Sequence, residues 1–129
     1  MASSVAAPAA LDAAITSLSE LLGDRLSTAE TVRQQHGHDA SYHPCAPPDA
    51  VAFPESTEEV SEIVKICAQH EVPIIPFGSG SGLEGHVVAL RGGVTIDLSR
   101  MNKILRVSPG DLAQIIFLRH WCEEHNAWG

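Results

Sequence analysis

A run of glycines and serines directly follows an apolar segment of this chain, and it limits which folds the chain can adopt. Residues 76–86 read PFGSGSGLEGH, with glycine at positions 78, 80, 82 and 85. Glycine is about 0.5–1 kcal/mol less favourable than alanine in regular structure, so the run predicts a loop whose backbone takes positive φ or lies against another molecule. Such a loop can direct successive amides at an anion, and the hydroxyls of Ser79 and Ser81 would add donors. A flexible surface loop with no ligand is the alternative.

The residues before this loop have the pattern of a strand, a helix and a second strand. The apolar run of residues 50–53 ends at Pro54 and predicts a short buried strand. Residues 56–59, STEE, form a capping-box pattern, and the apolar residues that follow at helical spacing predict a helix to about His70. Residues 72–77 form the second apolar run, in which prolines are tolerated at strand ends or on a sheet edge. Two strands joined by one helix are expected to run parallel, with a right-handed crossover.

Elements on either side of this unit complete an α+β pattern with short helices in front. Apolar residues at helical spacing predict a helix over 11–22 that ends at Gly23, after an irregular leader. The S-x-x-E pattern at Ser27–Glu30 predicts a second capping box and a short helix to about His36. Proline and turn-forming residues predict a loop over 37–49. The remaining expected elements are strands at 94–98 and 104–107, the first entered through a turn at Gly92 and Gly93, and an amphipathic helix within 113–129.

Composition and charge exclude several classes of protein. The chain has 129 residues, which fits one domain, and its formal net charge of −8 argues against nucleic acid as a partner, because phosphate backbones require a basic surface. No apolar run approaches the roughly 20 residues needed to cross a bilayer, so no transmembrane segment is expected. The first basic residue is Arg25, so the N-terminus lacks the charge pattern of a secretory signal or a transit peptide. Three cysteines are too few for a disulfide framework, and we expect a reducing, cytoplasmic compartment.

The glycine loop formally matches a dinucleotide-binding fingerprint. Residues 80–85 fit G-x-G-x-x-G, and Asp97 lies near the spacing expected for the acidic residue of that motif. The fingerprint opens a crossover helix, however, and a crossover needs at least about 10–12 residues. Only seven residues separate Gly85 from Gly93, and Val87 and Val88 among them favour a strand. A nicotinamide site of the doubly wound type is therefore disfavoured, and no Gly-Lys-Ser/Thr follows that would make a Walker loop.

Two groups of histidines and cysteines contain potential metal ligands. One comprises His36, His38, His43 and Cys45, and the other comprises His120, Cys122 and His125. Neither group has the paired spacing of a structural zinc site, so we expect loop and surface histidines and assign no metal ligand. Cys67 lies on the apolar face of the helix that follows residue 56 and is expected to be a small buried hydrophobe. No serine has a histidine and an aspartate at interpretable spacing, so no nucleophile is assigned.

Four segments together resemble a known family. They are HGHDAS at 36–41, PPDAVAFPESTEEVSEIV at 47–64, PIIPFGSGSGLEGHV at 73–87 and GGVTIDLSRMNKILRV at 92–107. The run from Arg33 to Asp111 resembles the FAD-linked oxidases and dehydrogenases with a PCMH-type, or vanillyl-alcohol-oxidase-like, FAD domain. Within that family it is most similar to the FAD-dependent D-lactate and glycolate dehydrogenases. The resemblance implies the N-terminal part of a PCMH-type FAD-binding domain, with FAD as its cofactor.

The resemblance also implies which residues contact the cofactor. The loop that would hold the FAD diphosphate comprises Pro76, Phe77, Gly78, Ser79, Gly80, Ser81, Gly82, Leu83, Glu84 and Gly85. The loop contains no lysine or arginine, so main-chain amides and serine hydroxyls would meet the phosphate charges. Glu84 is expected to point away from the phosphates or to accept hydrogen bonds from a sugar or the backbone, because like charges repel at close range. By analogy the turn at 99–103 lies near the adenine. Covalent attachment of FAD through His86 is not expected, since the resemblance is to members that bind FAD non-covalently.

The activity implied by the resemblance is oxidation of a small D-2-hydroxy acid to the 2-oxo acid, with hydride transfer to FAD. In the family, the groups that bind substrate and accept its proton lie in a later substrate domain, so no catalytic residue is assigned here. The chain alone is expected to be inactive, and a second polypeptide that completes the flavin domain is a candidate partner. A non-catalytic binding protein, or a degraded gene product, is the alternative.

The family pattern divides the chain into three parts. We expect an N-terminal helical segment and loop at 1–45, a partial PCMH-type FAD-binding domain at 46–112 and a divergent C-terminal tail at 113–129. Because the pattern ends near Asp111, we interpret the chain as an N-terminal fragment of a longer enzyme.

Overall fold

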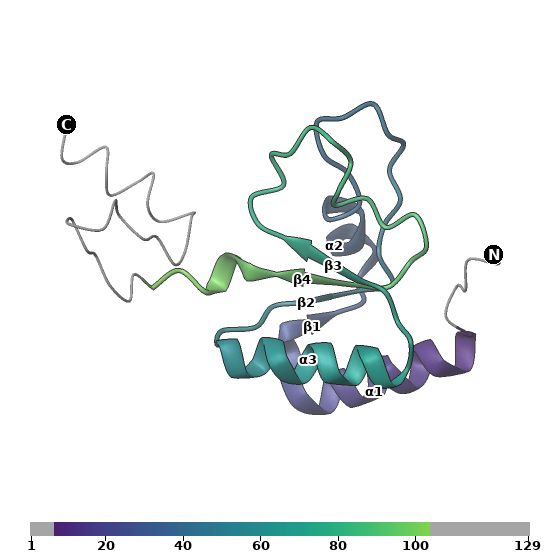
Figure 1. The fold of residues 1–129 in the computed structure, drawn as a ribbon, viewed down its shortest axis with the longest axis vertical. Coiled ribbons are helices and arrows are strands. Elements are labelled where there is room, and N and C mark those ends of the chain that lie inside the picture. Colours follow the sequence, from purple (N-terminus) through teal and green to yellow (C-terminus); the bar gives the residue numbers. More distant parts are fainter. Residues whose placement is uncertain (1–6, 104–129) are drawn as a thin grey trace.

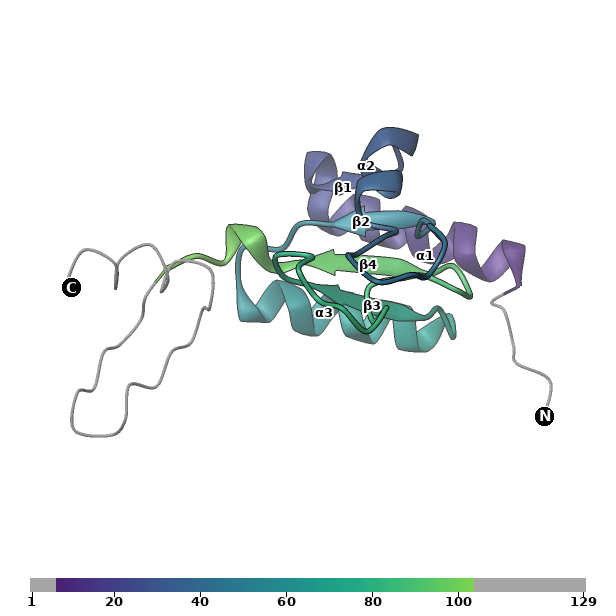
Figure 2. The ribbon, with the colours of Figure 1, turned by 90° about the horizontal axis from the view of Figure 1, so that it is seen from above.

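The chain folds into a four-stranded sheet with helices on both faces (Figure 1). The structure is a computed structural model and describes residues 7–103. Two helices, α1 (Pro8–Leu22) and α3 (Thr57–Gln69), cover one face of the sheet, and α2 (Glu30–Gln35) lies on the other side with two long loops. The view from above shows α1 and α3 lying side by side along the strands (Figure 2). The α+β class expected from the sequence is confirmed.

The strands follow the order β1-β2-β4-β3. Strand β1 (Leu26–Ser27) pairs antiparallel with β2 (Ala50–Ala52), whereas β2 and β3 (Ile74–Phe77) both pair parallel with β4 (Val94–Asp97). The three predicted strands and the parallel direction of β2 and β3 are confirmed. The strand β4 separates β2 from β3, because the chain returns to the middle of the sheet after the glycine loop. Strand β3 is therefore an edge strand of the described sheet, which explains why Pro76 is tolerated there.

The core lies between the sheet and the pair α1 and α3. Side chains alternate along the strands, so every second residue of β2 and β4 faces these helices. The fully or nearly fully buried cluster comprises Ala14, Leu18, Leu22, Ala50, Ala52, Ile63, Cys67, Val72, Val94 and Ile96. Burial raises the pKa of the Cys67 thiol to about 11, and the expectation of a small buried hydrophobe at this position is confirmed. Val64, one of the apolar residues at helical spacing after residue 59, is 42% exposed, so the buried face of α3 is narrower than the sequence pattern predicts.

Helix α1 begins earlier than expected. Its first residue is Pro8, inside the leader expected at residues 1–10, because proline at the first helical position has no unsatisfied amide and a φ suited to a helix. Its end at Gly23 is confirmed, and Gly23 has a φ of +56°. The 3₁₀ turn η1 (Gly23–Arg25) then leads into β1.

The first predicted capping box is wrong, although the helix itself is present. Ser27 belongs to β1, where it pairs with Val51, and its hydroxyl accepts a hydrogen bond from the amide of Ala29 at 3.3 Å. Helix α2 starts after Ala29, which provides no side-chain cap. Ser27 pairs with a strand that is distant in sequence, and it therefore does not cap α2.

The second predicted capping box is half formed. The hydroxyl of Ser56 accepts a hydrogen bond from the amide of Glu59 at 3.3 Å and caps α3. The Glu59 carboxylate accepts a hydrogen bond from the amide of Glu55, at 2.8 Å, and not from that of Ser56. The predicted strand at 104–107 and the predicted helix within 113–129 lie outside the described residues.

Candidate functional site

The carboxyl ends of three parallel strands meet at one edge of the sheet. Phe77 at the end of β3 pairs in register with Asp97 at the end of β4, and Ala52 of β2 pairs with Ile96. The loop at 78–93 leaves β3 at this edge, and the 3₁₀ turn η2 (Leu98–Arg100) leaves β4 beside it. In sheets with parallel strands, ligands bind outside the carboxyl ends of the strands. A binding site is therefore expected at this edge of the sheet.

The glycine loop has a conformation that only glycines allow at several positions. Gly80 and Gly85 have positive φ values of +68° and +72°. A Cβ atom on Gly80 would lie 2.7 Å from Cζ of Phe77. A Cβ on Gly82 would collide with the ring of His86, and one on Gly85 with the ring of His43. Side chains therefore pack directly against three glycines of the loop. A flexible surface loop without a ligand would not need glycine at these positions.

The amides of the loop are open to a ligand. Among the described residues, none of the amides from Ser79 to Glu84 donates a hydrogen bond to the protein. The hydroxyls of Ser79 and Ser81 lie 2.8 Å apart and bond to each other. These residues are exposed or half-buried, so their amides are accessible to an anionic group such as a diphosphate.

A carboxylate fixes the far end of the loop. Asp39 Oδ2 accepts a hydrogen bond from the amide of Gly85 at 2.9 Å, and Oδ1 accepts one from the amide of Ser41 at 2.9 Å. Hydrogen bonds from Ser41 lower the pKa of the Asp39 carboxyl most, and the Gly85 amide and the charge of His86 lower it further. The loop at 37–49 thus supports the glycine loop, a link that the sequence did not predict.

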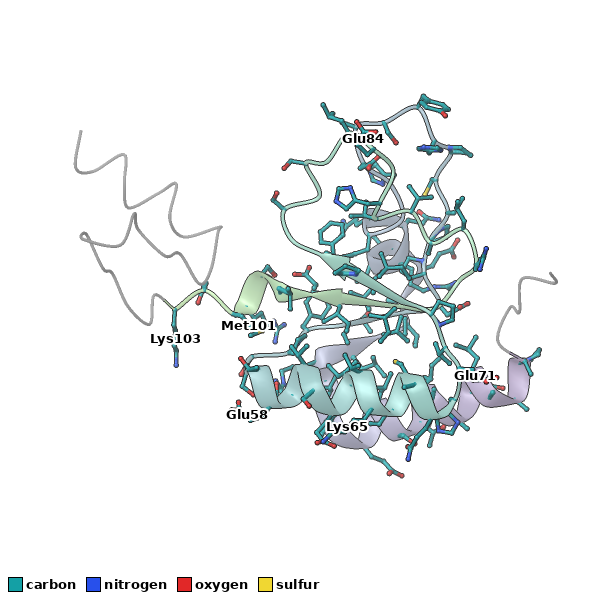
Figure 3. The ribbon with its side chains drawn as sticks, in the orientation of Figure 1. Glu58, Lys65, Glu71, Glu84, Met101 and Lys103 are labelled. Atoms are coloured by element: carbon teal, nitrogen blue, oxygen red, sulfur yellow. The ribbon has the colours of Figure 1, made fainter. Side chains whose placement is uncertain are left out.

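A cavity of about 640 Å³ lies between the glycine loop and the turn after β4. This volume is within the range of small-molecule sites. The residues that line it are Gly78, Ser79, Gly80, Ser81, Gly82, His86, Leu98, Ser99, Met101 and Asn102. Of the predicted cofactor residues, Pro76, Phe77, Leu83, Glu84 and Gly85 do not line it. Glu84 is exposed at the tip of the loop and does not line the cavity (Figure 3). Its direction relative to the phosphates stays a prediction.

His86, Leu98 and Met101 were not individually predicted as site residues. The family resemblance alone predicts that the turn at 99–103 lies near the adenine. A physical signal was available, since neighbouring parallel strands end at the same edge and the residues after each strand must therefore lie together.

Beneath the glycine loop lies a buried pair formed by His36 and Asp97. The Nδ1–H of His36 donates to the carbonyl of Val32 at 2.8 Å, and its Nε2 lies 2.8 Å from Oδ2 of Asp97. The His36 ring also packs against Phe77, with ring centroids 4.5 Å apart. Both ring nitrogens have protein partners, so His36 supports the floor of the site. Asp97, which the dinucleotide fingerprint would assign to a ribose, is likewise occupied.

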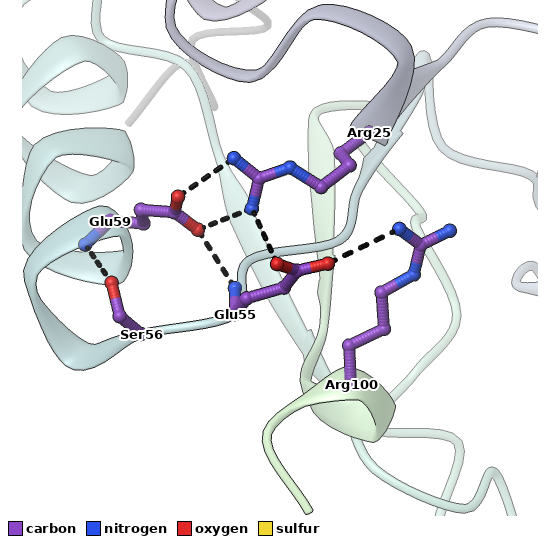
Figure 4. Close-up of polar contacts among 5 residues, drawn as sticks. All are labelled: Arg25, Glu55, Ser56, Glu59 and Arg100. Atoms are coloured by element: carbon purple, nitrogen blue, oxygen red, sulfur yellow. Dashed lines mark hydrogen bonds and ion pairs between the residues drawn. The ribbon is translucent and has the colours of Figure 1, made fainter.

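An ion-pair network holds the turn η2 in place (Figure 4). Arg25 donates two hydrogen bonds to Glu59, at 2.6 and 2.7 Å, and lies 3.8 Å from Glu55. Glu55 in turn pairs with Arg100 of η2 at 3.6 Å. The hydrogen bonds from Arg25 lower the pKa of Glu59 to about 2. The network thus connects η1, the start of α3 and η2, whose neighbouring residues line the cavity.

The site thus combines the carboxyl ends of parallel strands, a glycine loop with accessible amides and an adjoining cavity. A family model described as an FAD binding domain matches residues 48–116. The chain belongs to this FAD-binding domain family, and FAD is confirmed as the cofactor expected from the sequence.

Curated proteins and solved structures are also similar to this chain. The chain is 47% identical over 104 residues to the probable mitochondrial D-lactate dehydrogenase of Danio rerio, a match that covers 80% of this chain and 21% of that protein. It is 37% identical over 84 residues to the glycolate oxidase subunit GlcD of Bacillus subtilis, which covers 65% of this chain and 18% of the relative. A solved structure of an alkyldihydroxyacetonephosphate synthase superposes with a TM-score of 0.67 at 30% identity, covering 74% of this chain and 20% of that one.

These matches confirm the PCMH-type fold and the resemblance to FAD-linked oxidoreductases of the D-lactate and glycolate type. The chain spans about a fifth of the length of the curated relatives. In the part of the chain that the structure describes, no helix is long and apolar enough to cross a membrane. The three-part division at 45 and 112 stays a prediction.

Proposed function

We propose that this chain binds FAD and that the glycine loop after β3 holds the diphosphate. The free amides from Ser79 to Glu84 carry the proposal, because they form a row of unpaired donors at the carboxyl edge of the sheet, next to the cavity. Gly85 shapes the loop in this proposal, since its own amide is bonded to Asp39. Pro76 and Phe77 place the loop at the end of β3, and the Phe77 ring supports Gly80 from below.

The reaction proposed for the whole enzyme is oxidation of a D-2-hydroxy acid to the 2-oxo acid. The names of the D-lactate and glycolate relatives support this substrate class. When bound, FAD supplies the hydride-accepting chemistry. The residues of this chain hold the diphosphate through main-chain donors and position the dinucleotide along the strand ends. They keep negative charge away from it, because Glu84 is exposed outside the cavity and Asp97 is paired with His36.

The chain by itself is proposed to bind FAD without oxidising a hydroxy acid. The resemblance places the groups that bind the substrate and accept its proton in a later domain, and the chain spans about a fifth of the length of its relatives. The interpretation as a non-catalytic binding protein makes the same prediction for turnover, so turnover alone does not separate the two. Binding of FAD does separate them.

The test is a titration of the purified chain with FAD, followed by quenching of flavin fluorescence. Gly80→Val and Gly82→Val should each abolish binding, because their side chains would meet the rings of Phe77 and His86. Gly23→Val is the matched control for Gly80→Val, since Gly23 also has a positive φ and valine brings similar backbone strain there, but Gly23 does not line the cavity. Absence of FAD binding by the unmodified chain would refute the proposal. Reduction of a dye acceptor by D-lactate, measured in parallel, would refute the proposed lack of activity.

The compartment remains a proposal. The free cysteines Cys45 and Cys67 fit a reducing, cytoplasmic location, whereas the Danio rerio relative is named as mitochondrial. Import of the radiolabelled chain into isolated mitochondria tests this point. Protection from added protease after import would overturn the cytoplasmic assignment.

A further inference from the structure

One ionisable side chain, that of His86, is present among the described residues that line the cavity. The other lining residues are glycines and serines together with Leu98, Met101 and Asn102. The diphosphate of FAD carries two negative charges, and the glycine loop has no lysine or arginine to meet them. His86 is therefore the lining group that can supply a positive charge to a ligand there.

The backbone holds the His86 ring close to the loop. The imidazole lies against the Cα of Gly82, where any Cβ would collide with it. The next three residues, Val87, Val88 and Ala89, are buried, and the amide of Ala89 bonds to the carbonyl of Ala46 at 3.0 Å. The buried residues that follow fix the backbone of His86, whereas its side chain is exposed and is accessible to a ligand in the cavity.

The charged groups around His86 come from three segments. Asp39, in the loop at 37–49, is close enough for the charge of His86 to contribute to its lowered pKa, after the larger effect of Ser41. His43 of the same loop packs against Gly85, and Glu84 is exposed at the loop tip. Arg100 of η2 is directed to Glu55, at 3.6 Å. One carboxylate, Asp39, thus faces the imidazole, and it is already bonded to Ser41 and Gly85.

We propose that His86 is a binding residue for the FAD diphosphate, donating a charge-assisted hydrogen bond from its protonated ring, so that FAD affinity rises as the pH falls from 8 to 6. The proposal rests on the proposed function, because it requires that the diphosphate occupy the glycine loop. Hydrogen bonds between ionised partners are about twice as strong as neutral ones, and an imidazole gains its charge within this pH range. The diphosphate diester does not change its own charge there, which leaves the histidine as the source of the pH dependence.

The test measures the dissociation constant of FAD for the full chain at pH 6, 7 and 8. For the unmodified chain we expect affinity to be about tenfold higher at pH 6 than at pH 8, which corresponds to one charge-assisted hydrogen bond. His86→Gln keeps a neutral donor, and His86→Phe keeps the ring against Gly82. Both should lower affinity at pH 6 and remove the pH dependence. His86→Arg should keep high affinity at all three pH values.

Two controls make the result specific. His70→Gln makes the same chemical change at the C-cap of α3, which lies outside the lining, and should leave the pH dependence unchanged. Riboflavin lacks the diphosphate, so its binding should not depend on His86. FAD binding that is equally tight in the unmodified chain and in His86→Phe at every pH would overturn the role of His86 while leaving the proposed function intact. No FAD binding by any variant would overturn both.

Discussion

Nε2 of His36 lies 2.8 Å from Oδ2 of Asp97, although the two residues are 61 positions apart in the chain. Both are buried, with 7% and 5% of their surfaces exposed. The other carboxylate oxygen of Asp97 accepts a hydrogen bond from the amide of Ser99 at 2.8 Å, at the start of η2. The pair therefore joins the end of α2 to the turn that forms one wall of the cavity.

Replacement of Asp97 by alanine should destabilise the fold by about 1–3 kcal/mol, because it leaves a buried ring nitrogen of His36 without a partner. Asp97→Asn should cost less, since the side-chain amide keeps a hydrogen-bond partner beside Nε2 of His36 and its oxygen can still accept from the amide of Ser99. Urea denaturation followed by circular dichroism measures both values. An alanine variant as stable as the unmodified chain would show that the bonds from Asp97 to His36 and Ser99 contribute nothing.

The sequence pattern predicted the elements that bury one regular face. In α1, Leu18 and Leu22 face the core at helical spacing, and in β4 Val94 and Ile96 do so at strand spacing. Each of these elements carries its own signal, so an amphipathic helix or a buried strand can be recognised without its neighbours. The glycine loop was predictable for the same reason, because its composition excludes regular structure locally.

The sequence pattern gave wrong or missing predictions where contacts between residues far apart in the chain determine the local structure. Ser27 fits a local capping box, but pairing with Val51 places it in a strand. The bond from Gly85 to Asp39 spans 46 positions, and no periodicity marks either residue. Residue type alone makes His36, His38 and His43 potential metal ligands, whereas in the structure His36 is a buried support and the ring of His43 packs against Gly85. Such roles follow from tertiary contacts that one sequence does not reveal.

Stability should depend on pH through Glu59. Its pKa falls from an ordinary 4.5 to about 2 in the folded chain, chiefly because Arg25 donates hydrogen bonds to it. A carboxyl whose pKa is lowered by folding stabilises the fold fully above pH 4.5 and loses that contribution as the pH falls towards 2. Unfolding by urea at pH 2.5 to 6 should therefore show a decline in stability at low pH that is smaller in Glu59→Gln. Glu62→Gln, an exposed change on the same helix, is the control and should retain the decline. An identical decline in all three proteins would exclude Glu59 as its source.

Asp39 should restrain the far end of the glycine loop. Asp39→Asn removes the charge from the carboxylate that accepts the Gly85 amide, and neutral hydrogen bonds are about half as strong as charged ones. We expect the Gly85 amide to exchange with solvent deuterium about threefold to tenfold faster, as measured by NMR, and FAD affinity to fall by a similar factor. Asp12→Asn, on the exposed side of α1, should change neither quantity. An unchanged exchange rate at Gly85 in Asp39→Asn would remove this support from the loop.

Thr95, in the middle of β4, offers a change that should stabilise the chain. Its side chain is fully buried, and its hydroxyl oxygen has no hydrogen-bond partner among the described residues. A buried hydroxyl without a partner costs about 1–3 kcal/mol, whereas valine has nearly the same shape and no polar atom. Thr95→Val should therefore raise the free energy of unfolding by about 1 kcal/mol, which corresponds to a rise in Tm of about 4–8 °C for a domain of this size. Thr95→Ser, which keeps the hydroxyl and loses the methyl group, should lower it, because it leaves a small cavity. A lower Tm in Thr95→Val would mean that the hydroxyl does bond to a partner, such as a buried water, in the folded protein.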